Sequence, residues 1–110
     1  MKAAIKKKWL KALRSGEYVQ TRGTLCRIDH KGDHAFCCLG VLINETKGFD
    51  RLPKLGFNNH ARCEGSRRSL SFQHQKEFGL TEQEHDKLIT MNDQKRNRFT
   101  TIANWIEKNL

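Results

Sequence analysis

Two cysteines and two histidines in the first half of the chain are candidate metal ligands. Cys26, His30, His34 and Cys37 follow one another as C-x3-H-x3-H-x2-C. Thiolate and imidazole are the usual ligands of zinc, and a chain turn could bring the four together. Zinc sites more often use closer pairs, such as C-x2-C with H-x3-5-H. The sequence leaves zinc binding open, and we favour core cysteines beside a solvated turn that holds the histidines.

The adjacent Cys37 and Cys38 are the candidate nucleophiles. A helix that begins near them would lower the pKa of a thiol at its N-terminus. A catalytic cysteine also needs a base and an orienting group, and none of the five histidines stands in a diagnostic context. The neighbours Phe36, Leu39 and Val41 favour burial, which makes cysteines inert. We therefore assign no catalytic residue and lean towards a protein that is not an enzyme.

Arginines supply the third candidate chemistry, which is the binding of phosphate. A guanidinium group binds phosphate through two parallel hydrogen bonds, and an aromatic ring stacks on a base. G-x-G-x-x-G and Walker A loops are absent, so charge and residue type carry this prediction. Arginines would hold phosphate, the tyrosine would stack on a base, and the amides and the aspartate would orient the ligand. The predicted ligand-binding residues are Arg14, Tyr18, Gln20, Arg22, Arg27, Asn92 and Asp93.

Nucleic-acid binding is the alternative explanation for the excess of positive charge. The stretch from Leu80 has a residue pattern similar to that of a helix-turn-helix. However, the given sequence ends at Leu110 without a further helix for the major groove. We therefore favour a structural pair of helices there. A basic N-terminal helix and the turn after Asn92-Asp93 would instead contact phosphates. The residues of this alternative are Lys6, Lys7, Lys11, Lys95, Arg96 and Arg98.

The overall composition indicates one basic globular domain over residues 1–110. Lysine and arginine number 21 against 12 acidic residues, which gives a net charge of +9. Such an excess attracts anions, although solubility alone is a second reading of it. The expected partner is a nucleotide, a nucleic acid or an acidic host protein. The residues give no reason to assign a metal or a cofactor, and self-association stays open.

The N-terminal region indicates the cellular compartment in which we expect the protein. A lysine-rich run follows Met1, without the apolar stretch of a signal peptide, and nothing approaches the roughly 20 apolar residues of a membrane span. We expect a cytoplasmic protein with no membrane contact. All four cysteines, including Cys26 and Cys63, should then be reduced thiols.

Periodicity and turn residues predict a small α+β fold. An amphipathic helix over 2–14 precedes a hairpin with strands at 24–28 and 35–38, or a small antiparallel sheet, and a buried helix follows over 39–45. Residues 46–69 give no regular pattern, and a short helix is expected within 70–78. Thr81 and Glu84 form a capping box, Asn92-Asp93 is turn chemistry, and helical spacing resumes from Phe99 to Leu110. The last two helices should pack as an αα-hairpin.

Four segments in order along the chain carry a resemblance to known proteins: WLKALRSGEYVQTRGTL, FCCLGVL, FGLTEQEHDKLITMND and FTTIANWIEKNL. They resemble a family of small phage and prophage proteins with no settled activity, over about two-thirds of the chain. That family often carries a third cysteine and an acid after C-C-L-G-V-L, where this chain has Ile43-Asn44, and a glycine-bearing turn where this chain has Gln94 to Arg98. The basic turn is thus special to this protein.

The resemblance implies an accessory protein that acts on the host. Phage proteins of this size commonly inhibit a defence enzyme, bind nucleic acid or sequester a nucleotide signal. The function we expect is an anti-defence protein in the host cytoplasm that binds a phosphate-bearing ligand, such as a nucleotide signal of immunity. A nucleic-acid binder and an inhibitor that docks on an acidic host protein are the alternatives.

Overall fold

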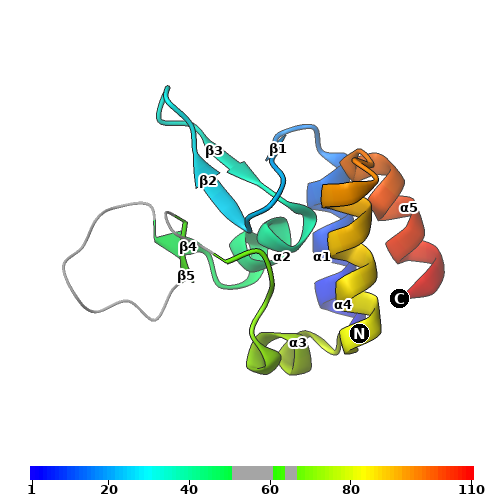
Figure 1. The fold of residues 1–110 in the computed structure, drawn as a ribbon. Coiled ribbons are helices and arrows are strands. Elements are labelled where there is room, and N and C mark those ends of the chain that lie inside the picture. The colour runs from blue at the N-terminus through cyan, green and yellow to red at the C-terminus, as the bar shows by residue number, and fades with distance from the viewer. Residues whose placement is uncertain (51–60, 64–66) are drawn as a thin grey trace.

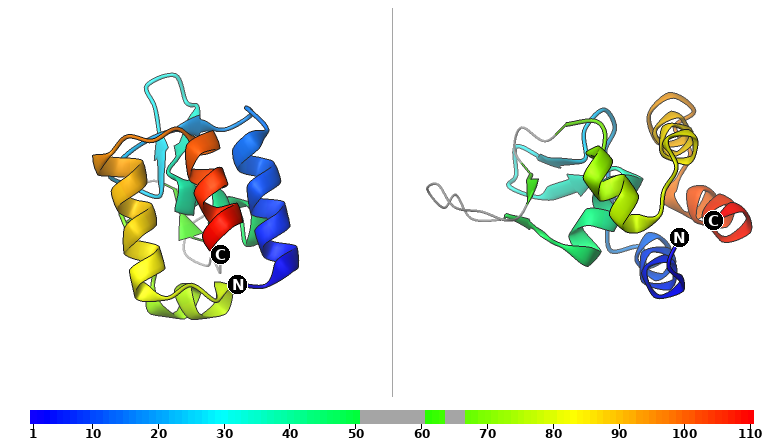
Figure 2. Two further views of the ribbon diagram at one scale, coloured as in Figure 1. Left: turned by 90° about the vertical axis from the view of Figure 1, so that its right-hand side faces the viewer. Right: turned by 90° about the horizontal axis from the view of Figure 1, so that it is seen from below.

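Three helices stand beside one another on one side of the molecule, and a small sheet lies on the other side, beyond a central helix (Figures 1 and 2). The structure is a computed structural model that describes residues 1–50, 61–63 and 67–110. The helices of the first group are α1 (Ala3–Arg14), α4 (Glu82–Ile89) and α5 (Phe99–Asn109), and the central helix is α2 (Cys38–Thr46). The predicted α+β class is confirmed.

Helix α1 follows from its apolar stripe. Trp9, Ala12 and Leu13 are buried against α2 and α5, while most of the lysines face solvent. Burying such a stripe is what stabilises a short helix in a folded protein. The Trp9 Nε1 donates a hydrogen bond to the backbone oxygen of Cys38 at 2.9 Å, so the indole nitrogen is satisfied within the core.

The main sheet has three short strands in the order β1-β3-β2. Strands β2 and β3 form the predicted antiparallel hairpin, with Cys26 opposite Phe36, and β1 adds a parallel neighbour that the sequence did not indicate. A second sheet pairs β4 with β5 in parallel. The strands are β1 (Val19–Gln20), β2 (Cys26–Ile28), β3 (His34–Phe36), β4 (Phe49–Asp50) and β5 (Ala61–Arg62). Both strands β4 and β5 lie within the stretch 46–69 that gave no regular pattern.

Helix α2 forms the centre of the core. Its first six residues, Cys38 to Ile43, are fully or almost fully buried. Gly40 allows the close approach of Leu25, the residue just before β2, because a Cβ at position 40 would lie 1.8 Å from the backbone oxygen of Leu25. The glycine in FCCLGVL is therefore required by packing.

The C-terminal helices begin where the sequence predicted. The capping box of Thr81 and Glu84 is present at the start of α4, and α3 (Phe72–Phe78) lies just before it. The turn predicted at Asn92-Asp93 is wrong: the chain there continues α4 as a π-helical segment, η1 (Thr90–Gln94). The side chain of Asn92 is held by other parts of the fold, which keeps the chain coiled, and the turn to α5 comes after Lys95.

The expectation of four reduced cysteines is wrong for two of them. Cys26 and Cys63 form a disulfide across 37 residues of sequence, with their Cα atoms 4.7 Å apart. The bond also removes Cys26 from the C-x3-H-x3-H-x2-C series, so these four residues do not form a zinc site. Within the described part of the chain, no group of three or more histidines, cysteines or acids is placed to hold a metal ion. Among the same residues, no helix is long and apolar enough to span a bilayer.

Candidate functional site

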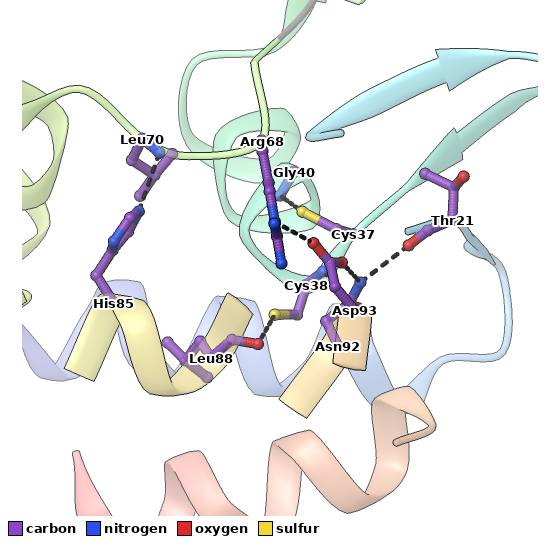
Figure 3. A network of polar contacts seen from close by, with 10 residues as sticks. All are labelled: Thr21, Cys37, Cys38, Gly40, Arg68, Leu70, His85, Leu88, Asn92 and Asp93. Carbon is purple, nitrogen blue, oxygen red and sulfur yellow. Dashed lines mark hydrogen bonds and ion pairs between the residues drawn. The ribbon is translucent and has the colours of Figure 1, made fainter. Parts of the chain in front are cut away.

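Asn92 is the centre of a polar network at the point where α2 begins (Figure 3). Its Oδ1 accepts hydrogen bonds from the backbone N–H of Cys38 at 3.2 Å and from Gln20 Nε2 at 2.8 Å. Its Nδ2 donates to the backbone oxygen of Thr21 at 2.9 Å and to Asp93 Oδ1 at 2.8 Å. Two acceptor and two donor positions are all that an amide side chain offers. Asn92 is 1% exposed and fully bonded, so it holds the fold together.

The two unpaired cysteines lie beside this network and are poor nucleophiles. Burial raises the pKa of the Cys37 thiol to about 11 and raises that of Cys38 well above its usual value. The Cys37 Sγ accepts a hydrogen bond from the backbone N–H of Gly40 at 3.4 Å, and the Cys38 Sγ contacts the backbone oxygen of Leu88 at 3.7 Å. Neutral buried thiols with backbone partners act as core residues.

Arg14 and Tyr18, two of the predicted ligand-binding residues, bond to side chains of other elements. Arg14 donates to Glu107 at 2.5 Å and to Asn104 at 3.0 Å, which links α1 to α5. The Tyr18 hydroxyl donates to Glu45 at 2.5 Å and accepts from an asparagine at the end of α2. The Tyr18 ring also packs edge-on against a phenylalanine of β3. These side chains join neighbouring elements.

Gln20, Asn92 and Asp93 come together from distant parts of the chain. Gln20 Nε2 bonds both Asn92 and the backbone oxygen of Asn97, so it fixes the turn after η1 to strand β1. Asp93 Oδ2 forms an ion pair with Arg68 Nε at 2.9 Å, and its side chain is 9% exposed. The polar groups of these three side chains are therefore occupied by bonds within the protein and are not free to contact a ligand. Several cations lie around them.

The cations around these three residues form one surface, which we call the η1 basic surface. The Arg22 guanidinium lies 3.5 Å from the backbone oxygen of Arg96, and the backbone oxygen of Arg67 accepts the N–H of Leu25 at 2.9 Å. These contacts bring together the β1–β2 loop, the segment before α3 and the turn between η1 and α5. The surface consists of Arg22, Arg67, Arg68, Lys95, Arg96 and Arg98, all of them exposed.

Arg96 is the most unusual member of the η1 basic surface. Its φ is 53°, in the left-handed region that glycine adopts freely. A residue with a Cβ pays roughly 1–2 kcal/mol for this conformation. Strain of this kind is often retained where a side chain serves a function.

The remaining predicted cations lie elsewhere. Arg27 is exposed on β2 opposite Ala35. Lys7 and Lys11 are exposed on α1, and Lys6 donates to the backbone oxygen of Glu107 at 3.1 Å. The residues predicted for nucleic-acid binding thus fall into two separate groups. Those in the turn from Lys95 to Arg98 belong to the η1 basic surface, and the lysines of α1 do not.

Arg67 and Arg68 are not among the ligand-binding residues predicted from the sequence. Their position depends on contacts that sequence spacing does not reveal. The buried His85 accepts the backbone N–H of Leu70 through Nε2 at 3.0 Å, and this bond holds the segment against α4 (Figure 3). The fold places Arg68 beside Asp93 and Arg67 beside Leu25.

Comparison with known proteins gives one partial match. The profile of a family described as a domain of unknown function (DUF8296) matches residues 1–48, which run from α1 to the end of α2. No curated protein and no solved structure matches the chain. Over residues 1–48 this chain is therefore similar to that domain.

Proposed function

We propose that this protein binds the phosphate backbone of nucleic acid through the η1 basic surface. The observation that carries the proposal is the convergence of exposed cations from three separate loops around Arg96, which is held in a strained conformation. Arginines bind phosphate through two parallel hydrogen bonds. Exposed cations spread over a surface suit an extended polyanion, which can contact several of them at once.

The expected nucleotide signal is a less favoured ligand. Its predicted site relied on Arg14 and Tyr18, whose polar groups already bond to Glu107 and Glu45. A nucleotide would have to replace these contacts, whereas the guanidinium of Arg96 and the ammonium of Lys95 are exposed. Following the resemblance to phage proteins, we propose host nucleic-acid defence as the setting in which this binding acts.

The test is fluorescence anisotropy with labelled single-stranded and duplex oligonucleotides at several salt concentrations. We expect affinity to fall steeply with salt, because phosphate contacts release counterions. Arg96→Gly should weaken binding roughly three- to tenfold, and it should lower the slope of log affinity against log salt by about one. The same variant should unfold at an equal or higher urea concentration, since glycine relieves the left-handed strain.

The matched control is Lys108→Ala, which removes the same charge from the far end of α5. It should change affinity much less than Arg96→Gly. Equal losses from both variants would mean that net charge alone drives binding, and no binding at low salt would dismiss the proposal. In the second case, capture by an acidic host protein would become the next function to test.

A further inference from the structure

A second site lies at the opposite end of α4 from the η1 basic surface. The start of α1, the end of α2 and the end of α3 meet there (Figures 1 and 2). A pocket of about 370 Å³ opens between these three helices, which is within the range of small-molecule sites. Its lining residues are Lys2, Ala4, Ile5, Lys8, Thr46, Lys47, Glu77 and Phe78.

The lining of this pocket is apolar below and basic at its rim. Phe78 is 2% exposed and belongs to the core, and Ile5 packs against that core from α1. The exposed Ala4 and the half-buried Ile5 therefore supply the apolar surface that a ligand can reach. An apolar chain placed here would remove surface from water on both sides, which favours binding.

The charge of the rim selects an anion. Lys47 Nζ donates to Glu77 Oε1 at 2.8 Å, so these two charges offset one another. This hydrogen bond, together with the nearby positive charges of Lys47 and Lys2, lowers the pKa of Glu77, which is therefore ionised at neutral pH. Lys2 and Lys8 are exposed, and within the described part of the chain neither side chain makes a hydrogen bond or an ion pair. Two ammonium groups are thus left for a ligand.

We propose that this pocket binds a small amphipathic anion, whose apolar chain lies on Ala4 and Ile5, above the buried Phe78, and whose anionic head meets Lys2 and Lys8. The apolar part of the lining suits the hydrocarbon chain of such a ligand, and the ammonium groups of the rim suit its anionic head. An uncharged chain would leave the ammonium groups without a partner, and a cationic chain would be repelled. This site is independent of the nucleic-acid binding proposed above, because it uses other residues at the other end of α4.

The experiment is a titration of the ¹⁵N-labelled protein with octanoate, followed by backbone amide shifts. We expect saturable shifts at residues around the pocket, and much weaker ones with octan-1-ol or octylamine. Lys8→Glu should weaken octanoate binding roughly three- to tenfold, as expected for the loss and reversal of one charge at a partly solvated site. The matched control is Lys7→Glu, one residue away on α1 and outside the lining.

A second variant tests the apolar half. Ala4→Trp places a large ring in the pocket from an exposed helical position, so α1 should still form, as circular dichroism would show. Octanoate shifts should then disappear. The proposal is overturned if octanoate causes no saturable shift, if octylamine shifts the same amides equally, or if Lys7→Glu weakens binding as much as Lys8→Glu.

Discussion

The side chain of Asn92 accepts the backbone N–H of Cys38 at 3.2 Å, although 54 residues of sequence separate them. This N–H is one of the first amides of α2, which have no partner inside the helix. The Gly40 amide, another of this set, is bonded to the Cys37 sulfur. The N-terminus of α2 is therefore capped by the protein's own groups, and the π-helical form of η1 carries Asn92 to this position.

Asn92→Ala should destabilise the protein strongly. The change leaves the buried N–H of Cys38 and the backbone oxygen of Thr21 without their partner, and each such loss costs about 1–3 kcal/mol. We expect the free energy of unfolding to fall by about 2–5 kcal/mol in urea denaturation. Asn109→Ala is the control, since Asn109 makes one exposed bond in the last turn of α5. Equal midpoints for both variants would refute the structural role of Asn92.

Gly40→Ala should destabilise the protein although alanine is the better helix former. A Cβ on residue 40 would lie 1.8 Å from the Leu25 backbone oxygen, and Leu25 is itself held by the hydrogen bond from its backbone N–H to the backbone oxygen of Arg67. Because the contact is to backbone, relief requires α2 to move. We expect a loss of about 2–4 kcal/mol in thermal or urea unfolding. Thr100→Ala, at an exposed position of α5, should change stability by less than about 0.5 kcal/mol.

The helices could be predicted from the sequence because their signals are local. The apolar stripe around Trp9 predicted a helix over 2–14, and α1 covers Ala3–Arg14. The pair Thr81 and Glu84 marked the start of α4, because a capping box is formed within one turn. Local chemistry of this kind needs no knowledge of the rest of the fold.

Features that depend on distant parts of the chain could not be predicted. Strand β1 has two residues and exists through its pairing with β3. The π-helical segment depends on what the Asn92 side chain reaches, so Asn92-Asp93 resembled a turn. Likewise, the convergence of the cations in the η1 basic surface depends on the contact between Arg22 and the backbone of Arg96 and on the Arg68–Asp93 ion pair.

Because the thiols of Cys37 and Cys38 are buried, we expect the free energy of unfolding to fall at high pH. Burial raises the pKa of Cys37 from its usual 9.0 to about 11 in the folded protein. The folded state therefore holds the thiol proton more tightly than the unfolded state does. This contribution to stability is complete below about pH 9, and it is lost as the pH rises through about 11.

The measurement is urea unfolding at about pH 8 and about pH 10.5. The wild type should lose more unfolding free energy over this interval than a Cys37→Ala, Cys38→Ala double variant, whose lysines titrate in the same way. Iodoacetamide should also leave both thiols of the folded protein unmodified at neutral pH. Rapid modification of either thiol under native conditions would contradict their burial.

The Cys26–Cys63 disulfide should contribute substantially to stability. It closes a loop across 37 residues, for which the chain-entropy model gives about 3–5 kcal/mol. Without reductant, the unfolded protein should show two free thiols, and it should show four after reduction. A dithiol reductant should lower the urea midpoint of the wild type to that of a Cys26→Ala, Cys63→Ala variant and leave the variant unchanged. Four thiols in the untreated protein, purified under air, would show that the bond does not form.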